Sequence, residues 1–261
     1  MRETDVRKKL YAHCIAPIFA ATLFGAGSAP ANAQSQRIAI PSYFYPGPVW
    51  KQAVASGPVV ALTIINPGSG PGTHQDPLYA STVKEAQARH ITVLGYVDTA
   101  YSKRKPADVL ADVKLFRDWY HVDGIFLDEA SNTLPGVPYY KALYKTIKAG
   151  APKGLIVLNP GCPTIEEYLG AGDVLCTFEQ DGATYRDHFV GAAWTAKHPA
   201  SRFWHIVYNV GNTADMLRTV TLTKQRNAGW VYITPDTLPN PYDTLPDADY
   251  WHAEIEAAAR K

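Results

Sequence analysis

Short runs of apolar, often β-branched residues recur along the chain, and each is followed by a polar loop. The runs are apolar nearly throughout, whereas strands with one face in water alternate apolar and polar residues. Continuous apolar runs of this length are typical of parallel strands that helices cover. The pattern predicts eight strands: Arg37–Tyr43, Val59–Asn66, Ile91–Asp98, Gly124–Glu129, Leu155–Asn159, Val174–Glu179, Phe203–Asn209 and Trp230–Thr234.

Most of the predicted strands are separated by stretches whose apolar residues recur with helical spacing. These stretches predict helices over Leu78–His90, Ala107–Tyr120, Tyr139–Ala149, Tyr185–His198, Ala214–Ala228 and Asp249–Arg260. After the first strand, Pro46, Gly47 and Pro48 leave room only for a short helix around Trp50 to Ala55. Eight strands with helices between them predict an α/β fold, a closed (β/α)8 TIM-type barrel in a single domain, with an open doubly wound sheet as the alternative.

The first 33 residues have the composition of an export signal. Arg2, Arg7, Lys8 and Lys9 precede a short apolar stretch over Ile15–Gly27, and Ala31-Asn32-Ala33 is a small-x-small cleavage site. The apolar stretch is too short to span a bilayer. We therefore expect residues 1–33 to be a cleaved signal peptide, residues 34–261 to form the barrel, and the mature protein to be secreted or periplasmic without a membrane anchor.

Charge and cysteine content narrow the choice of partner. The formal net charge of +1 gives no electrostatic case for binding nucleic acid or an anionic membrane, so we expect an uncharged or modestly charged partner. Cys176 falls in the middle of a predicted strand, whereas Cys162 lies just beyond the end of the preceding one. This offset is too large for a disulfide, so both thiols are expected to be free and buried.

Polar residues gather where the predicted strands end. The terminal residues are Tyr43, Asn66, Asp98, Asp128-Glu129, Asn159, Glu179, Asn209 and, just beyond the last strand, Asp236. In (β/α)8 enzymes the active site is built at the C-terminal ends of the strands. Asn and Asp also begin turns, and for Asn66 and Asn159 this interpretation is about as good as a ligand-facing one.

Asp128, Glu129 and Glu179 are the predicted catalytic residues. Asp128 and Glu129 end the fourth strand and Glu179 ends the sixth, so their side chains can face each other across the barrel mouth. Glycoside hydrolysis needs two such groups, an acid for the leaving oxygen and a carboxylate as nucleophile or base. Neighbouring side chains of a strand point to opposite faces, so Asp128 and Glu129 are not expected to meet the same atom. Which of them acts directly, and whether the mechanism is retaining, inverting or substrate-assisted, stays open.

Other positions near the rim are candidates for binding substrate. We select Tyr43, Asn66, Tyr96, Asp98, Asn159, Tyr185, His205 and Asp236. The tyrosines offer flat faces to the C–H surfaces of sugar rings, and His205 lies within the seventh strand. The sequence contains neither the H-x-x-x-H spacing of a metal site nor the G-x-S-x-G of a serine hydrolase, so no metal and no cofactor are predicted.

Several segments together resemble the spherulin-4-like family, which contains the fungal Sph3-type glycoside hydrolases. They are Ile40–Tyr43, Ile65–Gly72, Val93–Val97, Trp119–Glu129, Val157–Gly161, Thr177–Glu179, Asn240–Asp243 and Leu245-Pro246. The resemblance covers nearly all of the chain after residue 33. It implies a (β/α)8 fold and endo-acting hydrolysis of an N-acetylgalactosamine-containing polysaccharide such as galactosaminogalactan. It also implies that Asp128, Glu129 and Glu179 are needed for activity.

Two other functions are kept as alternatives. A non-catalytic carbohydrate-binding protein, or a structural protein of a wall or spore, could use the same fold without hydrolysis. Polysaccharide deacetylation would need a metal site of the kind that the sequence lacks. The expected partner is a polysaccharide rich in amino sugars, and the sequence does not specify an oligomeric state.

Overall fold

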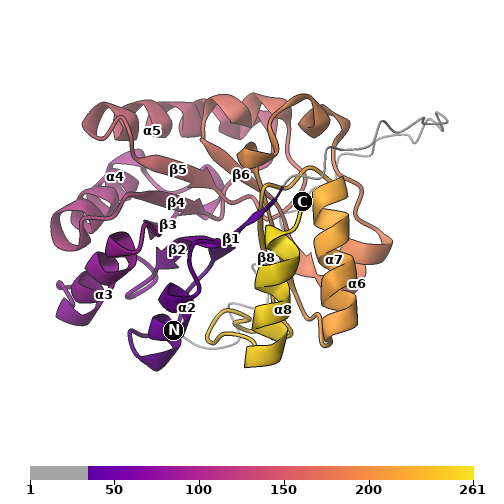
Figure 1. Ribbon diagram of the computed structural model, residues 1–261. Helices are drawn as coiled ribbons and strands as arrows, with labels where there is room; N and C mark the ends of the chain where they lie inside the picture. The colour runs from indigo at the N-terminus through magenta and orange to yellow at the C-terminus, as the bar shows by residue number, and fades with distance from the viewer. Residues whose placement is uncertain (1–34) are drawn as a thin grey trace.

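The computed structural model describes residues 35–261, so the predicted signal peptide lies outside the described residues. Eight parallel strands form a closed barrel in sequence order (Figure 1). They are β1 (Arg37–Ile40), β2 (Val60–Ile65), β3 (Thr92–Asp98), β4 (Gly124–Asp128), β5 (Leu155–Leu158), β6 (Val174–Asp181), β7 (Phe203–Tyr208) and β8 (Trp230–Ile233). All eight predicted strands are present, and β1 pairs with β8, which confirms the closed barrel over the open sheet.

Helices surround the strands on the outside (Figure 1). They are α2 (Pro48–Ala55), α3 (Pro77–Ala88), α4 (Pro106–Leu115), α5 (Val137–Gly150), α6 (Gly182–Asp187), α7 (Thr213–Gln225) and α8 (Ala248–Ala259). Proline at the first turn of α2, α3 and α4 fits the helix start, because its missing N–H would be unpaired there in any case. Asp76, Asp181, Asn212 and Asp247 cap α3, α6, α7 and α8 through their side chains.

The prediction of one helix over Tyr185–His198 is wrong. The helix ends at Asp187, and a short 3-10 turn follows over Ala193–Lys197. Phe189 turns inward, where its ring packs 4.6 Å from Phe178 and 5.3 Å from Tyr185 between ring centres. This aromatic contact takes the chain off the helical path, and the following Gly191 would weaken a continued helix.

The barrel interior is filled by aromatic side chains. Tyr96 and Phe126 lie 6.3 Å apart between ring centres, and Phe126 and Trp204 lie 5.7 Å apart. Two glycines permit the strands and helices around this core to approach closely. A Cβ at Gly124 would lie 2.0 Å from the Leu155 carbonyl oxygen, and one at Gly95 would lie 2.4 Å from the Phe116 ring. The barrel interior is therefore filled by side chains, and open space begins only toward the C-terminal ends of the strands.

Cys162 and Cys176 are both buried thiols that form no disulfide, as predicted. Within residues 35–261, none of the helices combines the length and the apolar character needed to cross a bilayer.

Glu254 of α8 has a buried carboxyl group that contacts β8. Its Oε1 accepts the Ile233 backbone N–H at 2.8 Å, and Oε2 is buried without a hydrogen-bond partner. Burial raises the pKa of Glu254 to about 8. The folded protein therefore keeps this proton up to about pH 8, whereas the unfolded chain releases it near the ordinary value of 4.5. The free energy of unfolding should fall as the pH rises between these two values.

We predict that Glu254→Gln removes this pH dependence, because glutamine keeps an acceptor for Ile233 and cannot ionise. Relative to the parent protein, the variant should gain on the order of 4 kcal/mol between pH 5 and pH 9, or about 8–16 °C in Tm. Thermal unfolding across this range measures the effect. Glu256→Gln, on the exposed side of the same helix, is the control and should leave the parent's pH dependence unchanged. Equal pH slopes for Glu254→Gln and the parent would contradict the assignment.

Candidate active site

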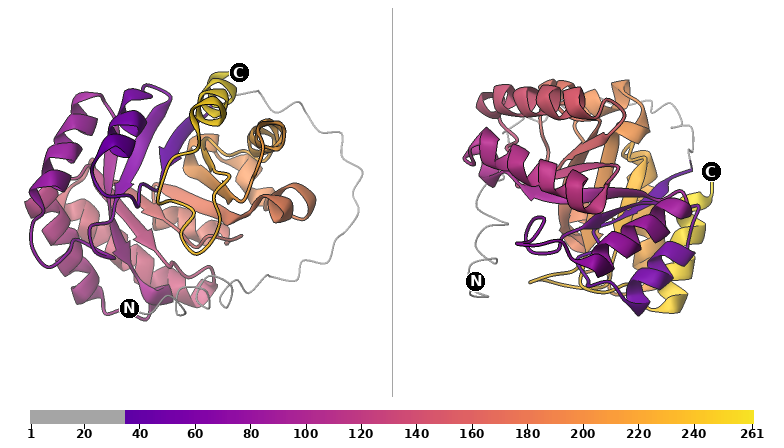
Figure 2. Two further views of the ribbon diagram at one scale, coloured as in Figure 1. Left: turned by 90° about the horizontal axis from the view of Figure 1, so that it is seen from below. Right: turned by 90° about the vertical axis from the view of Figure 1, so that its left-hand side faces the viewer.

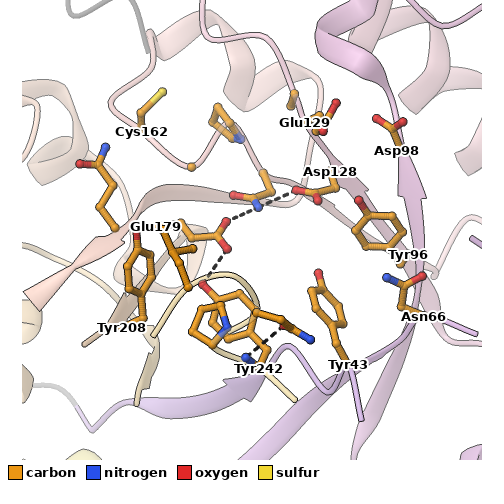
Figure 3. Close-up of a pocket in the computed structure, with 18 of the residues that line it drawn as sticks. Tyr43, Asn66, Tyr96, Asp98, Asp128, Glu129, Cys162, Glu179, Tyr208 and Tyr242 are labelled. Carbon is orange, nitrogen blue, oxygen red and sulfur yellow. Dashed lines mark hydrogen bonds between the residues drawn. The ribbon is translucent and has the colours of Figure 1, made fainter. Parts of the chain in front are cut away.

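A cavity of about 500 Å³ opens at the C-terminal ends of the strands. The segment between β8 and α8 lies across this end of the barrel (Figure 2, left, yellow). The side chains that line the cavity come from nearly every strand end (Figure 3). They belong to Tyr43, Asn66, Ser69, Tyr96, Asp98, Tyr101, Asp128, Glu129, Ala130, Asn132, Asn159, Pro160, Cys162, Glu179, Gln180, Tyr208 and Leu238–Tyr242, with Gly161 completing the wall.

Asp128 and Glu179 are bridged by one amide group. The Asn159 Nδ2 donates to Asp128 Oδ1 at 2.7 Å and to Glu179 Oε2 at 2.5 Å. The two accepting oxygens are therefore at most 5.2 Å apart. Asn159 follows β5, which lies between β4 and β6 in the barrel, so the order of the strands places the amide between the two acids. The expectation that these carboxyl groups face each other is met.

A β-bulge in β6 turns Glu179 toward the cavity. The pairing with β7 shifts between Cys176 and Phe178, so that Thr177 is an extra residue in the strand. Thr177 and Phe178 both contact His205 on the outer face of the barrel, and Glu179 then points inward. Without the extra residue, Glu179 would face away from Cys176 and out of the cavity, because side chains alternate along a strand.

Burial and mutual charge set the protonation of the pair. Desolvation, followed by the negative charge of Asp128, raises the pKa of Glu179 to about 7. The pKa of Asp128 is also raised by burial, and hydrogen bonds from the Tyr96 hydroxyl and Asn159 oppose that rise. The two environments make Glu179 the group with a proton to give near neutral pH.

Tyr242 is a second donor to Glu179, and it was not among the predicted site residues. Its hydroxyl donates to Glu179 Oε1 at 2.7 Å, which lowers the pKa of the acid against the effect of burial. Its carbonyl oxygen accepts the Tyr43 backbone N–H at 3.1 Å, which ties the β8–α8 segment to the end of β1. The only signal for Tyr242 in the sequence was the Asn240–Asp243 segment of the family resemblance, which ends no strand.

Asp128 and Glu129 both line the cavity, and that they do not meet the same atom of the substrate stays a prediction (Figure 3). The strand ends at Asp128, and Glu129 has a left-handed backbone with φ of 46°. Side chains alternate between the two faces of a strand only while the backbone is extended. The extended backbone ends at Asp128, so alternation does not send the Glu129 side chain to the opposite face.

Five of the eight predicted substrate-binding residues line the cavity: Tyr43, Asn66, Tyr96, Asp98 and Asn159. That they bind substrate stays a prediction. Tyr185, His205 and Asp236 are not part of the lining. Other residues that the prediction did not select do line it, among them Tyr101, Tyr208, Gln180 and Asn132. Tyr101 and Tyr208 could be recognised only as aromatic residues near strand ends.

Tyr185 and His205 form a buried cluster on the outer face of the barrel. The Tyr185 hydroxyl lies 2.8 Å from His205 Nδ1, and Thr177 Oγ1 lies 3.0 Å from Nε2. Burial lowers the pKa of His205 to about 3, so the imidazole is neutral. Its neighbours in β7, Trp204 and Tyr208, point to the interior, and alternation along the strand sends His205 outward.

Asp236 stabilises the β8–α8 segment instead of facing the cavity. Its side chain accepts the Thr237 backbone N–H at 2.8 Å, and its carboxyl group is hydrogen-bonded to that of Asp243. The Asp236 carbonyl oxygen also accepts the Asn209 N–H at 2.7 Å. Asp236 thus acts as a turn residue, the ordinary role of an Asp just after a strand.

The chemistry of the lining is acidic and aromatic. Four carboxyl groups face the cavity, from Asp98, Asp128, Glu129 and Glu179, and among the described residues its wall has no Lys, Arg or His. Within residues 35–261, no group of three or more His, Cys, Asp and Glu side chains has the geometry of a metal site. Such a wall suits neutral or amine-bearing sugars and repels polyanions.

The sequence and the fold match known proteins. The model of spherulation-specific family 4 matches residues 37–258. Spherulin-4 of Physarum polycephalum is 32% identical over 169 residues, which cover 63% of this chain and 50% of that protein. The chain thus spans about half the length of the curated relative it matches.

Two solved structures share the barrel. Sph3 of Aspergillus clavatus, solved in complex with GalNAc, is 24% identical with a TM-score of 0.75, and the match covers 87% of this chain and 98% of that one. The cyclic α-maltosyl-(1→6)-maltose hydrolase of Arthrobacter globiformis is 11% identical with a TM-score of 0.57, and the match covers 90% and 78% of the two chains. At these identities the likeness concerns the fold.

We predict that Glu179 titrates near pH 7 and that Tyr242→Phe moves its titration to higher pH, since the lost hydroxyl favours the ionised carboxylate. NMR of protein labelled with ¹³C at the glutamate side-chain carboxyl carbon follows this titration without any substrate. Tyr45→Phe, which removes an exposed hydroxyl bonded to Asp76, is the control and should not move the Glu179 signal. A Glu179 titration below pH 5, or one unaffected by Tyr242→Phe, would contradict the assignment.

Proposed function

The chain belongs to spherulation-specific family 4, and from this membership and the bridged acids we propose that it is an exported, endo-acting glycoside hydrolase. Its substrate is a polysaccharide that contains N-acetylgalactosamine or galactosamine. The observation that carries the proposal is the Asn159 amide held between Asp128 and Glu179 at the floor of an open cavity. Two carboxyl groups at this separation are the machinery of glycoside hydrolysis.

Glu179 is the general acid and base in this proposal. A pKa of about 7 leaves a large part of the group protonated at neutral pH, as proton donation to the glycosidic oxygen requires. After the leaving sugar departs, the Glu179 carboxylate takes a proton from the attacking water. The Tyr242 hydroxyl and the Asn159 amide hold one oxygen each, which orients the carboxyl group in both steps.

Asp128 is the nucleophile. Tyr96 and Asn159 donate hydrogen bonds to it, so its charged form is favoured over that of Glu179. The carboxylate attacks the anomeric carbon as the glycosidic bond breaks, and water then releases the glycosyl group from Asp128. Separations of about 5–5.5 Å belong to retaining enzymes and about 6.5–9.5 Å to inverting ones. The upper limit of 5.2 Å between the bridged oxygens therefore supports retention.

Three observations support the choice of substrate. The cavity is acidic and aromatic, which suits an amino-sugar polymer and disfavours uronic acids. Tyr43 and Tyr96 pack edge to face with ring centres 5.7 Å apart and offer apolar surface for a sugar ring. The family relative Sph3 was solved with GalNAc bound. The export of the protein is proposed from the basic and apolar composition of residues 1–33.

We predict that the protein releases oligosaccharides from galactosaminogalactan, and that Asp128→Asn and Glu179→Gln each lower kcat by at least about 10³-fold, since each acid acts in the bond-breaking step. New reducing ends and product length measure the reaction. Glu85→Gln changes an exposed glutamate on α3 and should have the parent's activity.

The results also separate hydrolysis from non-catalytic carbohydrate binding. Folded protein that releases nothing from any amino-sugar polymer would contradict the hydrolase proposal. If it still bound those polymers, and Glu179→Gln bound them equally well, the binding role would be favoured. Activity of Glu179→Gln equal to that of the parent would exclude Glu179 as the general acid.

A further inference from the structure

The junction between the β3 loop and the end of β4 has an unusual backbone. Three consecutive residues, Ala100, Tyr101 and Ser102, have φ of 46°, 55° and 67°, and Glu129 beside them has φ of 46°. Residues other than glycine rarely adopt this left-handed region, because Cβ then crowds the following carbonyl group. Two of these four residues, Tyr101 and Glu129, line the cavity, so part of the backbone strain lies where side chains are presented to it.

Thr99 connects these two strained segments. It is fully buried, and its backbone N–H donates to the Asp128 carbonyl oxygen at 3.0 Å. Its Oγ1 lies 2.8 Å from the Asp128 carbonyl oxygen and 2.9 Å from that of Glu129. The Tyr101 N–H donates to the same Glu129 oxygen at 2.7 Å. The backbone on both sides of the Glu129 Cα is thus held from the β3 loop.

Tyr140 of α5 directs the Thr99 hydroxyl. The Tyr140 oxygen accepts the Ser131 N–H at 2.9 Å and lies 2.9 Å from Thr99 Oγ1. The Ser131 N–H already donates to the Tyr140 oxygen, so the Tyr140 hydroxyl proton can be donated to Thr99 Oγ1. The threonine proton then points to the two carbonyl oxygens. Tyr140 is itself fully buried, which makes it a fixed anchor.

We infer that Thr99 is a positioning residue that holds Glu129 in its left-handed backbone, so that the Glu129 carboxylate faces substrate beside Asp128. In extended backbone the Glu129 side chain would point away from the cavity, because neighbouring residues of a strand alternate. The hydrogen bonds from Thr99 and Tyr101 offset the strain of the left-handed conformation. The kinetic consequence of this role rests on the proposed hydrolysis, whereas its structural consequence does not.

The kinetic test compares Thr99→Val, which keeps the shape and loses the hydroxyl, with Thr99→Ser, which keeps the hydroxyl. Thr99→Val should lower kcat/KM on an amino-sugar oligomer by roughly 10- to 100-fold, since displacing a group of the active site by about 1 Å can cost that much activity. Thr99→Ser should restore most of the activity. In a Glu129→Ala background, Thr99→Val should have little further effect, because both changes remove the same carboxylate from the site.

Thr219→Val is the matched control. Thr219 is also fully buried and its hydroxyl donates to a backbone carbonyl at 2.7 Å, but it lies in α7. It should keep the parent's kcat/KM. Parent-like activity of Thr99→Val, or a loss that adds in full to that of Glu129→Ala, would overturn the inference. If Thr99→Val does not fold, Thr99→Ala replaces it in the same comparison.

A crystal structure of the Thr99 variant tests the structural consequence without any substrate. We expect Glu129 to leave the left-handed region and its carboxylate to leave the cavity. A Glu129 that keeps its φ near 46° and its place beside Asp128 would overturn the inference. If the parent protein hydrolyses no amino-sugar polymer, the proposed function fails, and this structure still decides the role of Thr99.

Discussion

The Asn159 side chain, with its amide nitrogen between the carboxyl groups of Asp128 and Glu179, is the contact on which the rest of the site depends. An amide nitrogen has two hydrogens, and here each is directed to a different acid. The contact is possible because β5 lies between β4 and β6, which only the order of strands in the closed barrel guarantees. Without the bridge, two partly buried carboxylates at this distance would repel each other with no donor between them.

The surroundings of the bridge give the two acids different environments. Glu179 lies above the buried thiol of Cys176, and its donors are Asn159 and Tyr242. Asp128 has Tyr96 and Asn159 as donors and adjoins the hydrogen-bonded junction at Thr99. Below the two acids, the packed rings of Tyr96, Phe126 and Trp204 fill the barrel interior. A pair of acids whose pKa values are driven apart in this way can share the work of acid and nucleophile.

The repeat of apolar runs was sufficient to predict all eight strands, the closed barrel and the position of the acids at its rim. Strand ends are recognisable because polar residues follow apolar runs, and Asp128, Asn159 and Glu179 were identified in this way. Their bridging was not predicted, since it depends on side-chain geometry across three strands.

The features that sequence reasoning missed depend on departures from regular backbone. The bulge at Thr177 reverses the face of Glu179, and the left-handed Glu129 brings a second acid to the cavity. Tyr242 reaches the site from a segment that ends no strand, so only a family resemblance could point to it. Tyr185, near a strand end, and His205, within a strand, were selected for the site because position along the chain does not reveal which face a side chain occupies.

The central claim is that Asp128 and Glu179, held close together by Asn159, act as nucleophile and general acid. Proton NMR of the first product released from a defined N-acetylgalactosamine or galactosamine oligomer tests it most directly, because the anomeric signal is read before mutarotation. The bridged geometry predicts that the first product keeps the anomeric configuration of the bond that was cleaved. A first product of inverted configuration would contradict the account, since inverting enzymes hold their two carboxyl groups about 6.5–9.5 Å apart to leave room for a water.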